Sequence, residues 1–267
     1  MPRVRRPDRP KGYRSRPGKH VRHNQVVWDR VSAWYERHCS AVLGGPYAAS
    51  WGMFRLPERE LHLLGRVRGQ RVLEVGCGAA RWSMALQRQG AHATGIDLSG
   101  AQLAKARQLQ RRARVRFPLV HGSVEQLPFP DASFDVVFCD WGGLTFSDPR
   151  RSVPECSRVL RRGGRFVFAT ASPIRNITLD ARADRQVPRL VRPYFGSGRL
   201  DLGPNDTIEF CPPYGVWIDL FRQNGLAIDR LVETRPFPGQ GSKYLSRSDA
   251  RWARSWPMEA IWKLTKE

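Results

Sequence analysis

Short apolar runs alternate with amphipathic stretches through the middle of the chain. Five runs have the length of buried strands and are bounded by glycine, proline or polar residues: 71–75, 93–96, 115–120, 134–140 and 165–169. Between them, apolar residues recur at helical spacing over 80–89, 100–112 and 150–160. Strands that alternate with helices through short links predict an α/β fold with a parallel, doubly wound sheet.

The pattern changes on both sides of this core. Before it, residues 24–43 and 57–65 predict helices, the first because its aromatic and β-branched residues follow a helical period. After it, residues 172–214 are rich in proline, glycine and polar side chains, which is typical of an inserted irregular segment. A helix at 214–224, a strand at 226–233, a short helix at 248–258 and a last strand at 260–264 complete the pattern.

The two late strands are expected to pair as a hairpin and to join the sheet. The sheet would then be Rossmann-like and seven-stranded, mostly parallel with an antiparallel last strand. We therefore divide the chain into a disordered basic tail (1–22), an N-terminal helical lid (23–68), a cofactor-binding core (69–170) and a final part (171–267). That final part would hold a substrate-side insertion and the strands that complete the sheet.

Composition and charge limit the partners and the cellular location that we expect for this chain. The chain has 267 residues and a net charge of +21, and residues 1–22 alone hold nine Lys or Arg and one Asp. Such a tail could attract RNA, but a solvated basic surface with a flexible terminus is the favoured explanation of the charge. No apolar run is long enough to span a membrane, and no secretory signal is visible. Five scattered cysteines without a C-x-x-C pair predict neither a disulfide framework nor a metal site, so the cytoplasm is the expected location.

A glycine loop follows the first predicted strand. Gly76 and Gly78 allow a tight turn and let a ligand approach main-chain N–H groups. Asp97 ends the second strand about twenty residues later, and a carboxylate can accept both hydroxyls of a ribose. The glycine loop and this carboxylate together predict an adenosine-type cofactor. An NAD-dependent oxidoreductase shares these features, but it would need a third glycine where this chain has Arg81.

Four stretches together resemble the motifs of class I S-adenosylmethionine-dependent methyltransferases of the type 11 kind. In order, these stretches are 72–78, 95–99, 127–137 and 158–164, and the likeness covers residues 70–170. Residues 252–263 resemble a bacterial, actinobacterial subgroup. The resemblance implies S-adenosyl-L-methionine as cofactor, S-adenosyl-L-homocysteine as product, and methyl transfer as the reaction.

The resemblance also implies which residues contact the cofactor. Glu74, Gly76, Cys77 and Gly78 would surround the methionine end, and Asp97 the ribose. The adenine would lie near Leu98, Ser123, Val124 and Glu125, where Ser123 replaces the family's usual acid. Asp140 and Trp141 would lie where the methyl group emerges.

The acceptor is predicted to be a small molecule, methylated by in-line displacement at the carboxyl edge of the sheet. A general base is needed only for some acceptors, and its candidates are His38, Asp140 and His121. Tyr35 and Trp51 could also touch ligand, in a pocket built by residues 24–55 and 172–214. An RNA methyltransferase or an RNA-binding protein that uses the basic tail remains the alternative. The segment Cys211-Pro212-Pro213-Tyr214 resembles a loop of amino-group methyltransferases, but it follows the fifth strand instead of the fourth.

Overall fold

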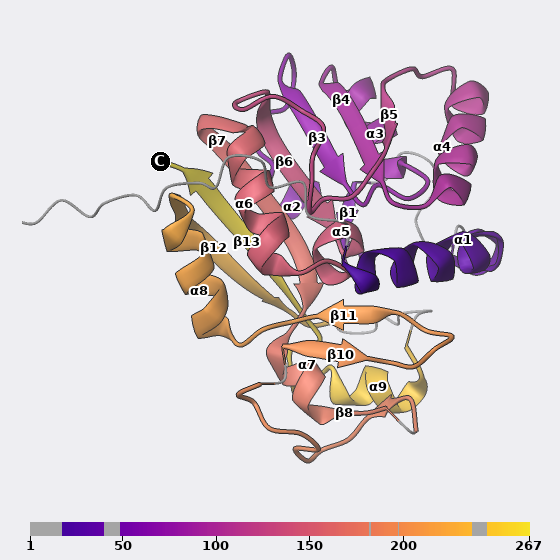
Figure 1. The fold of residues 1–267 in the computed structure, drawn as a ribbon, viewed down its shortest axis with the longest axis vertical. Coiled ribbons are helices and arrows are strands. Elements are labelled where there is room, and N and C mark those ends of the chain that lie inside the picture. The colour runs from indigo at the N-terminus through magenta and orange to yellow at the C-terminus, as the bar shows by residue number, and fades with distance from the viewer. Residues whose placement is uncertain (1–17, 40–48, 182, 197, 237–244) are drawn as a thin grey trace, which may run out of the picture.

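A seven-stranded sheet forms the centre of the computed structural model, which describes residues 18–39, 49–181, 183–196, 198–236 and 245–267 (Figure 1). Its strand order is β12-β13-β7-β6-β3-β4-β5. The strands are β3 (Arg71–Val75), β4 (His92–Asp97), β5 (Leu119–His121), β6 (Phe134–Asp140), β7 (Leu160–Ala171), β12 (Leu226–Thr234) and β13 (Glu259–Lys266). Neighbours from β5 to β7 are parallel, whereas β13 is antiparallel to both β7 and β12. The predicted Rossmann-like sheet is confirmed.

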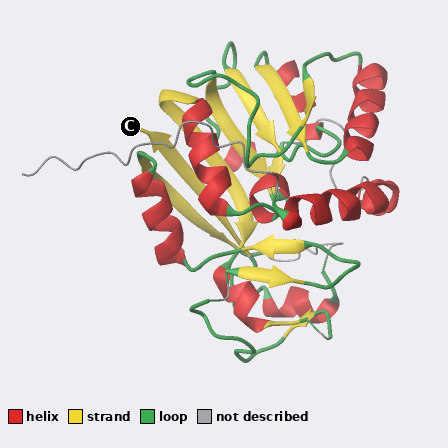
Figure 2. Ribbon diagram, in the orientation of Figure 1, coloured by secondary structure: helices red, strands yellow, loops and turns green. Residues whose placement is uncertain are grey.

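Helices cover both faces of this sheet (Figure 2). The principal ones beside the strands are α3 (Arg81–Arg88), α4 (Gly100–Ala113), α6 (Pro149–Val159) and α8 (Tyr214–Gln223). On one face, Val153 of α6 and Phe221 of α8 pack in the same cluster as Val137. On the other face, Trp82 of α3 packs with Phe138. Because both faces of β6 are covered, its sequence is a continuous apolar run and not an alternating one.

Several predicted boundaries are wrong. The third strand begins at Leu119 and not at residue 115, because the left-handed Arg114 caps α4 and the chain passes Pro118 before pairing. The turn expected at 161–164 lies inside β7, where the pairing with β6 shifts register and Gly163 has φ 67°. The helix expected at 57–65 is only α2 (Glu58–Leu61), because His62 is left-handed. The late helix α9 (Arg247–Trp252) also ends earlier than predicted.

Helix α1 (Lys19–Cys39) lies across the carboxyl ends of the strands (Figure 1). It begins inside the range 1–22 that we expected to be disordered, because His20 and Val21 are held by the core. His20 Nε2 lies 2.5 Å from Glu125 Oε1, and Val21 is buried. Residues 1–17 and 40–43 lie outside the described part of the chain, so the rest of the tail and the predicted end of this helix stay predictions.

The described part of the inserted segment 172–214 packs against α1. It contains α7 (Pro173–Thr178) and two hairpins, β8 (Leu179–Asp180) with β9 (Arg185–Gln186) and β10 (Arg199–Asp201) with β11 (Ile208–Phe210). The buried Asn24 of α1 donates to Ile208 O at 2.9 Å and accepts from Ile208 N at 2.8 Å. The insertion therefore holds the helix that covers the edge of the sheet.

Three short elements remain: β1 (Ser50–Trp51) and β2 (Leu56–Pro57) in the lid, and α5 (Gly142–Thr145) directly after β6. The first two pair as an antiparallel hairpin whose Trp51 is fully buried. Among the described helices, we find none that is long and apolar enough to cross a lipid bilayer.

Candidate active site

A cavity of about 300 Å³ opens at the carboxyl edge of the sheet, between the strand ends and α1. Its walls come from the glycine loop, the ends of β4 and β6, the helix α1 and residues 50–55. The expected contribution of residues 24–55 is thus present, through side chains such as Trp28, Tyr35 and Met53. The described part of 172–214 contributes no wall residue, contrary to our expectation, because it packs against α1 from outside the cavity.

The glycine loop is held by backbone contacts. Gly76 N and Cys77 N both donate to Ile96 O, at 2.8 and 3.0 Å. A Cβ atom on Gly76, which has φ 66°, would overlap the backbone of Gly143 after β6. Ala80 replaces a third glycine and nevertheless adopts φ 56°, so this turn has a left-handed residue with a side chain. The loop therefore lies directly between the ends of β4 and β6.

Glu74 lies behind this loop and is buried. Its Oε2 accepts from Ser83 N at 2.9 Å and from Ser83 Oγ at 2.5 Å. Burial raises the pKa of Glu74 to about 8, and the nearby carboxylates of Asp140 and Asp97 add to the rise. A cationic group at this end of the cavity would favour the ionised carboxylate, so the site suits the amino group of a methionine.

Asp97 is placed by the backbone on both sides of it. Its Oδ2 accepts from Gly78 N at 2.7 Å, and its Oδ1 accepts from Ser99 N at 2.8 Å. Burial raises its pKa, and those two N–H groups oppose the rise. Each oxygen has remaining acceptor capacity, and Asp97 lines the cavity, so it is placed to accept ribose hydroxyls.

The predicted adenine contacts are only partly brought together. Leu98, Ser123 and Val124 line the cavity beside Asp97. Glu125 does not line it, because its carboxylate holds His20 and accepts from Asp148 N at 2.8 Å. This residue joins α1 to the start of α6.

The three candidate bases are also separated. Asp140 lines the cavity, whereas His121 is exposed outside it and hydrogen bonds Leu98 O at 2.8 Å. The side chain of His38 lies outside the described part of the structure. Trp51, expected to touch ligand, packs instead against Trp82 in the core, with their ring centroids 4.8 Å apart.

Asp140 and Trp141 end β6 at the cavity wall. Asp140 Oδ1 accepts from Gly52 N at 2.8 Å, and its Oδ2 accepts from Trp82 Nε1 at 3.3 Å. Burial raises the pKa of Asp140 to about 6, against the effect of these two donors. Trp141 adopts φ 67° and donates its indole N–H to Glu259 of β13. An acid and a large aromatic ring are thus held side by side.

Sequence reasoning missed several wall residues. Trp28 packs edge-to-face on both Tyr35 and Phe146, with ring centroids 5.6 and 5.1 Å apart. Arg55 and Arg81 also line the cavity, and the buried Nε of Arg55 has no hydrogen-bond partner among the residues that the structure describes. Trp28 and Arg55 lie in the lid, Arg81 begins α3 and Phe146 follows α5, and no motif marks any of them as a ligand contact. Apart from the masked segments, no three His, Cys, Asp or Glu residues are grouped as metal ligands.

A glycine loop, a buried acid behind it and the cavity-lining carboxylate of Asp97 are together typical of a site for an adenosine-type cofactor. A family model described as "Methyltransferase domain" matches residues 73–168.

Comparison with known proteins agrees with this class. Demethylmenaquinone methyltransferase from Listeria welshimeri is 32% identical over 176 residues, which cover 64% of this chain and 71% of the relative. The enzyme of that name from Clavibacter sepedonicus is 38% identical over 207 residues, covering 76% and 81% of the two chains. A solved S-adenosylmethionine-dependent methyltransferase from Mesorhizobium loti has a TM-score of 0.63 at 22% identity, covering 80% of this chain and 100% of its own. This chain belongs to the class I S-adenosylmethionine-dependent methyltransferases, and S-adenosyl-L-methionine is its cofactor.

Proposed function

We propose that this enzyme methylates a small, flat and largely apolar acceptor by in-line displacement at the carboxyl edge of the sheet. The observation that carries the proposal is the aromatic half of the cavity. Tyr35, Trp28 and Phe146 form a row of rings, and Trp141 adds another ring at the end of β6. Rings of this kind bind flat apolar molecules through their faces and edges. The relatives named demethylmenaquinone methyltransferases point to a quinol-type acceptor.

The other half of the cavity suits the cofactor. Glu74 would hold the amino group, Asp97 the ribose hydroxyls, and Leu98 with Val124 the adenine. Arg55 places a cation in the same cavity, which suits the carboxylate of the methionine part. When bound, S-adenosyl-L-methionine supplies an activated methyl group on sulfur.

What the protein adds is alignment and removal of water. The nucleophilic atom must approach the methyl carbon on the side opposite the sulfur, and fixed aromatic walls restrict the acceptor to such an approach. Of the three candidate bases, Asp140 lines the cavity. A pKa of about 6 leaves it ionised at neutral pH and a stronger proton acceptor than an ordinary aspartate. We infer that Asp140 takes the proton of a hydroxyl or enol acceptor.

The test is a direct assay with methyl-labelled S-adenosyl-L-methionine. Separate reactions would contain a short-chain demethylmenaquinol, simpler hydroxylated naphthalenes, or total RNA. We expect label in the quinol and none in RNA. Label in RNA alone would favour the alternative in which the basic tail binds nucleic acid, and would overturn the small-molecule acceptor.

A further inference from the structure

Glu259 is fully buried where β6, β7, β12 and β13 end side by side. Its Oε1 accepts from the indole N–H of Trp141 and from Met53 N, the latter at 2.7 Å. Its Oε2 accepts from Thr234 Oγ1 at 3.0 Å. One carboxylate therefore joins the last strand to two residues of the cavity wall that are distant in sequence.

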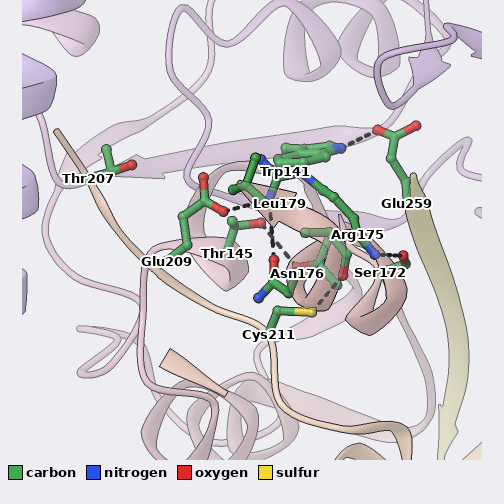
Figure 3. Close-up of polar contacts among 12 residues, drawn as sticks. Trp141, Thr145, Ser172, Arg175, Asn176, Leu179, Thr207, Glu209, Cys211 and Glu259 are labelled. Atoms are coloured by element: carbon green, nitrogen blue, oxygen red, sulfur yellow. Dashed lines mark hydrogen bonds and ion pairs between the residues drawn. The ribbon is translucent and has the colours of Figure 1, made fainter. Parts of the chain in front are cut away.

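The ring of Trp141 is also held on its face. Arg175 of α7 lies over the ring with its guanidinium carbon 5.6 Å from the centroid, and it pairs with Glu209 of β11 at 2.9 Å. Figure 3 shows the indole N–H directed at Glu259, with the Arg175–Glu209 pair near the ring. Glu259 therefore holds the edge of the Trp141 ring, and Arg175 holds its face. The Glu259 oxygen that binds the ring edge also binds Met53 N.

The neighbouring acid completes the arrangement. Asp140 accepts from Gly52 N while Glu259 accepts from Met53 N, so a partly buried and a fully buried carboxylate hold two successive residues of the lid. A Cβ atom on Gly52, which has φ 67°, would overlap the carboxylate of Glu259. The lid segment is consequently fixed against β6 and β13 together.

We propose that Glu259 is a positioning residue for methyl transfer. By holding Trp141 and Met53 with one oxygen, it sets the wall against which the acceptor lies. This inference rests on the proposed function, in which the acceptor binds beside Trp141. The hydrogen bonds of Glu259 go to Met53, Trp141 and Thr234, whereas Glu74 and Asp97 are held by other partners, so loss of Glu259 should affect the alignment of the acceptor more than cofactor affinity.

The ionisation of Glu259 provides a specific readout. The pKa of Glu259 is raised to about 7, chiefly by burial and also by the charge of Asp140, while the N–H groups of Met53 and Trp141 oppose the rise. The charged groups facing it are Asp140 on β6 and Arg175 on α7. Loss of a proton from Glu259 strengthens its bond with the indole N–H, because charged acceptors make stronger hydrogen bonds.

The experiment follows the Trp141 indole by NMR in the full chain with S-adenosyl-L-homocysteine bound, and the resonance is assigned from the W141F variant. We expect the wild-type resonance to move with pH around neutrality, and the movement to be absent in E259Q. E259A should lower kcat for the acceptor about ten- to a hundredfold, as expected for a misplaced reactant. E259Q retains an acceptor oxygen and should recover most of that loss. The affinity of both variants for S-adenosyl-L-homocysteine should stay within about twofold.

The matched control is T234V, which removes the third partner of the carboxylate and should leave the indole resonance in place. Movement that persists in E259Q would belong to Asp140 and would overturn the proposal. An equal loss of cofactor affinity would also overturn it, since Glu259 would then support the whole site. If no acceptor is methylated by the wild type, the proposed function fails, and the NMR result still decides whether Glu259 holds Trp141.

Discussion

Asp29 of α1 accepts a hydrogen bond from the hydroxyl of Ser99, with the two oxygens 2.6 Å apart. The same carboxylate oxygen accepts from Ala101 N at 3.1 Å, and Ser99 N in turn donates to Asp97. An acid of α1 therefore caps α4 at the turn that follows Asp97, the carboxylate predicted to bind the ribose. This contact therefore couples the position of α1 to that of Asp97, which lines the cavity.

The first prediction concerns this coupling. D29A should weaken binding of S-adenosyl-L-homocysteine about two- to tenfold, since a partly exposed hydrogen bond of this kind contributes about 0.5–1.5 kcal/mol. Calorimetry would measure the affinity. D219A is the matched control, because it removes an exposed acid from the outer helix α8. Equal effects of the two variants would mean that charge alone, and not the contact with Ser99, is responsible.

The second prediction tests the ribose assignment. D97A should lower the affinity for S-adenosyl-L-homocysteine about a hundredfold, since bonds to a charged group contribute up to about 3 kcal/mol and the cofactor would lose two acceptors. D97N retains one oxygen and should lose less. Circular dichroism would show whether the fold is kept. Unchanged affinity in a folded D97A variant would refute the assignment.

The third prediction follows from the raised pKa of Glu74, about 8 against the ordinary 4.5. Between these values the folded protein holds a proton that the unfolded chain has released. The stability of the cofactor-free protein should therefore fall as pH rises from about 5 to about 8. Asp140 and Glu259, with pKa values of about 6 and about 7, act in the same direction.

Thermal unfolding across this pH range would measure the effect. E74Q cannot ionise, so its melting temperature should fall less steeply than that of the wild type. S-adenosyl-L-methionine should bind the wild type more tightly as pH rises towards 8, because its amino group favours the ionised Glu74. Parallel melting curves for wild type and E74Q would show that Glu74 does not carry the dependence.

The local pattern of apolar residues was sufficient to predict much of the sheet, but it was insufficient to predict the contacts of the lid. The bounds of β3 and β6 agree with the prediction because buried parallel strands are continuous apolar runs between turn residues. The predicted start of β7 was wrong because the strand runs through the apparent turn, where Gly163 has a positive φ and the pairing with β6 shifts register. Contacts such as Asp29 with Ser99, 70 positions apart, and Trp141 with Glu259, 118 apart, depend on packing that no local period encodes. Glu125 was assigned to adenine from its position in a motif, whereas its carboxylate holds α1.

The last prediction concerns proton transfer. D140N keeps an oxygen for the N–H of Gly52 but cannot accept a proton from the acceptor. If Asp140 is the base, kcat at neutral pH should fall by about a hundredfold or more, with little change in cofactor affinity. W82F provides the control, because it removes the N–H donor to Asp140 Oδ2 and leaves the acid in place. Without that donor the pKa of Asp140 should rise, so the lower limb of the pH–rate profile should move to higher pH in W82F and vanish in D140N. Retention of this limb in D140N would assign it to another group and leave Asp140 as the anchor of the lid.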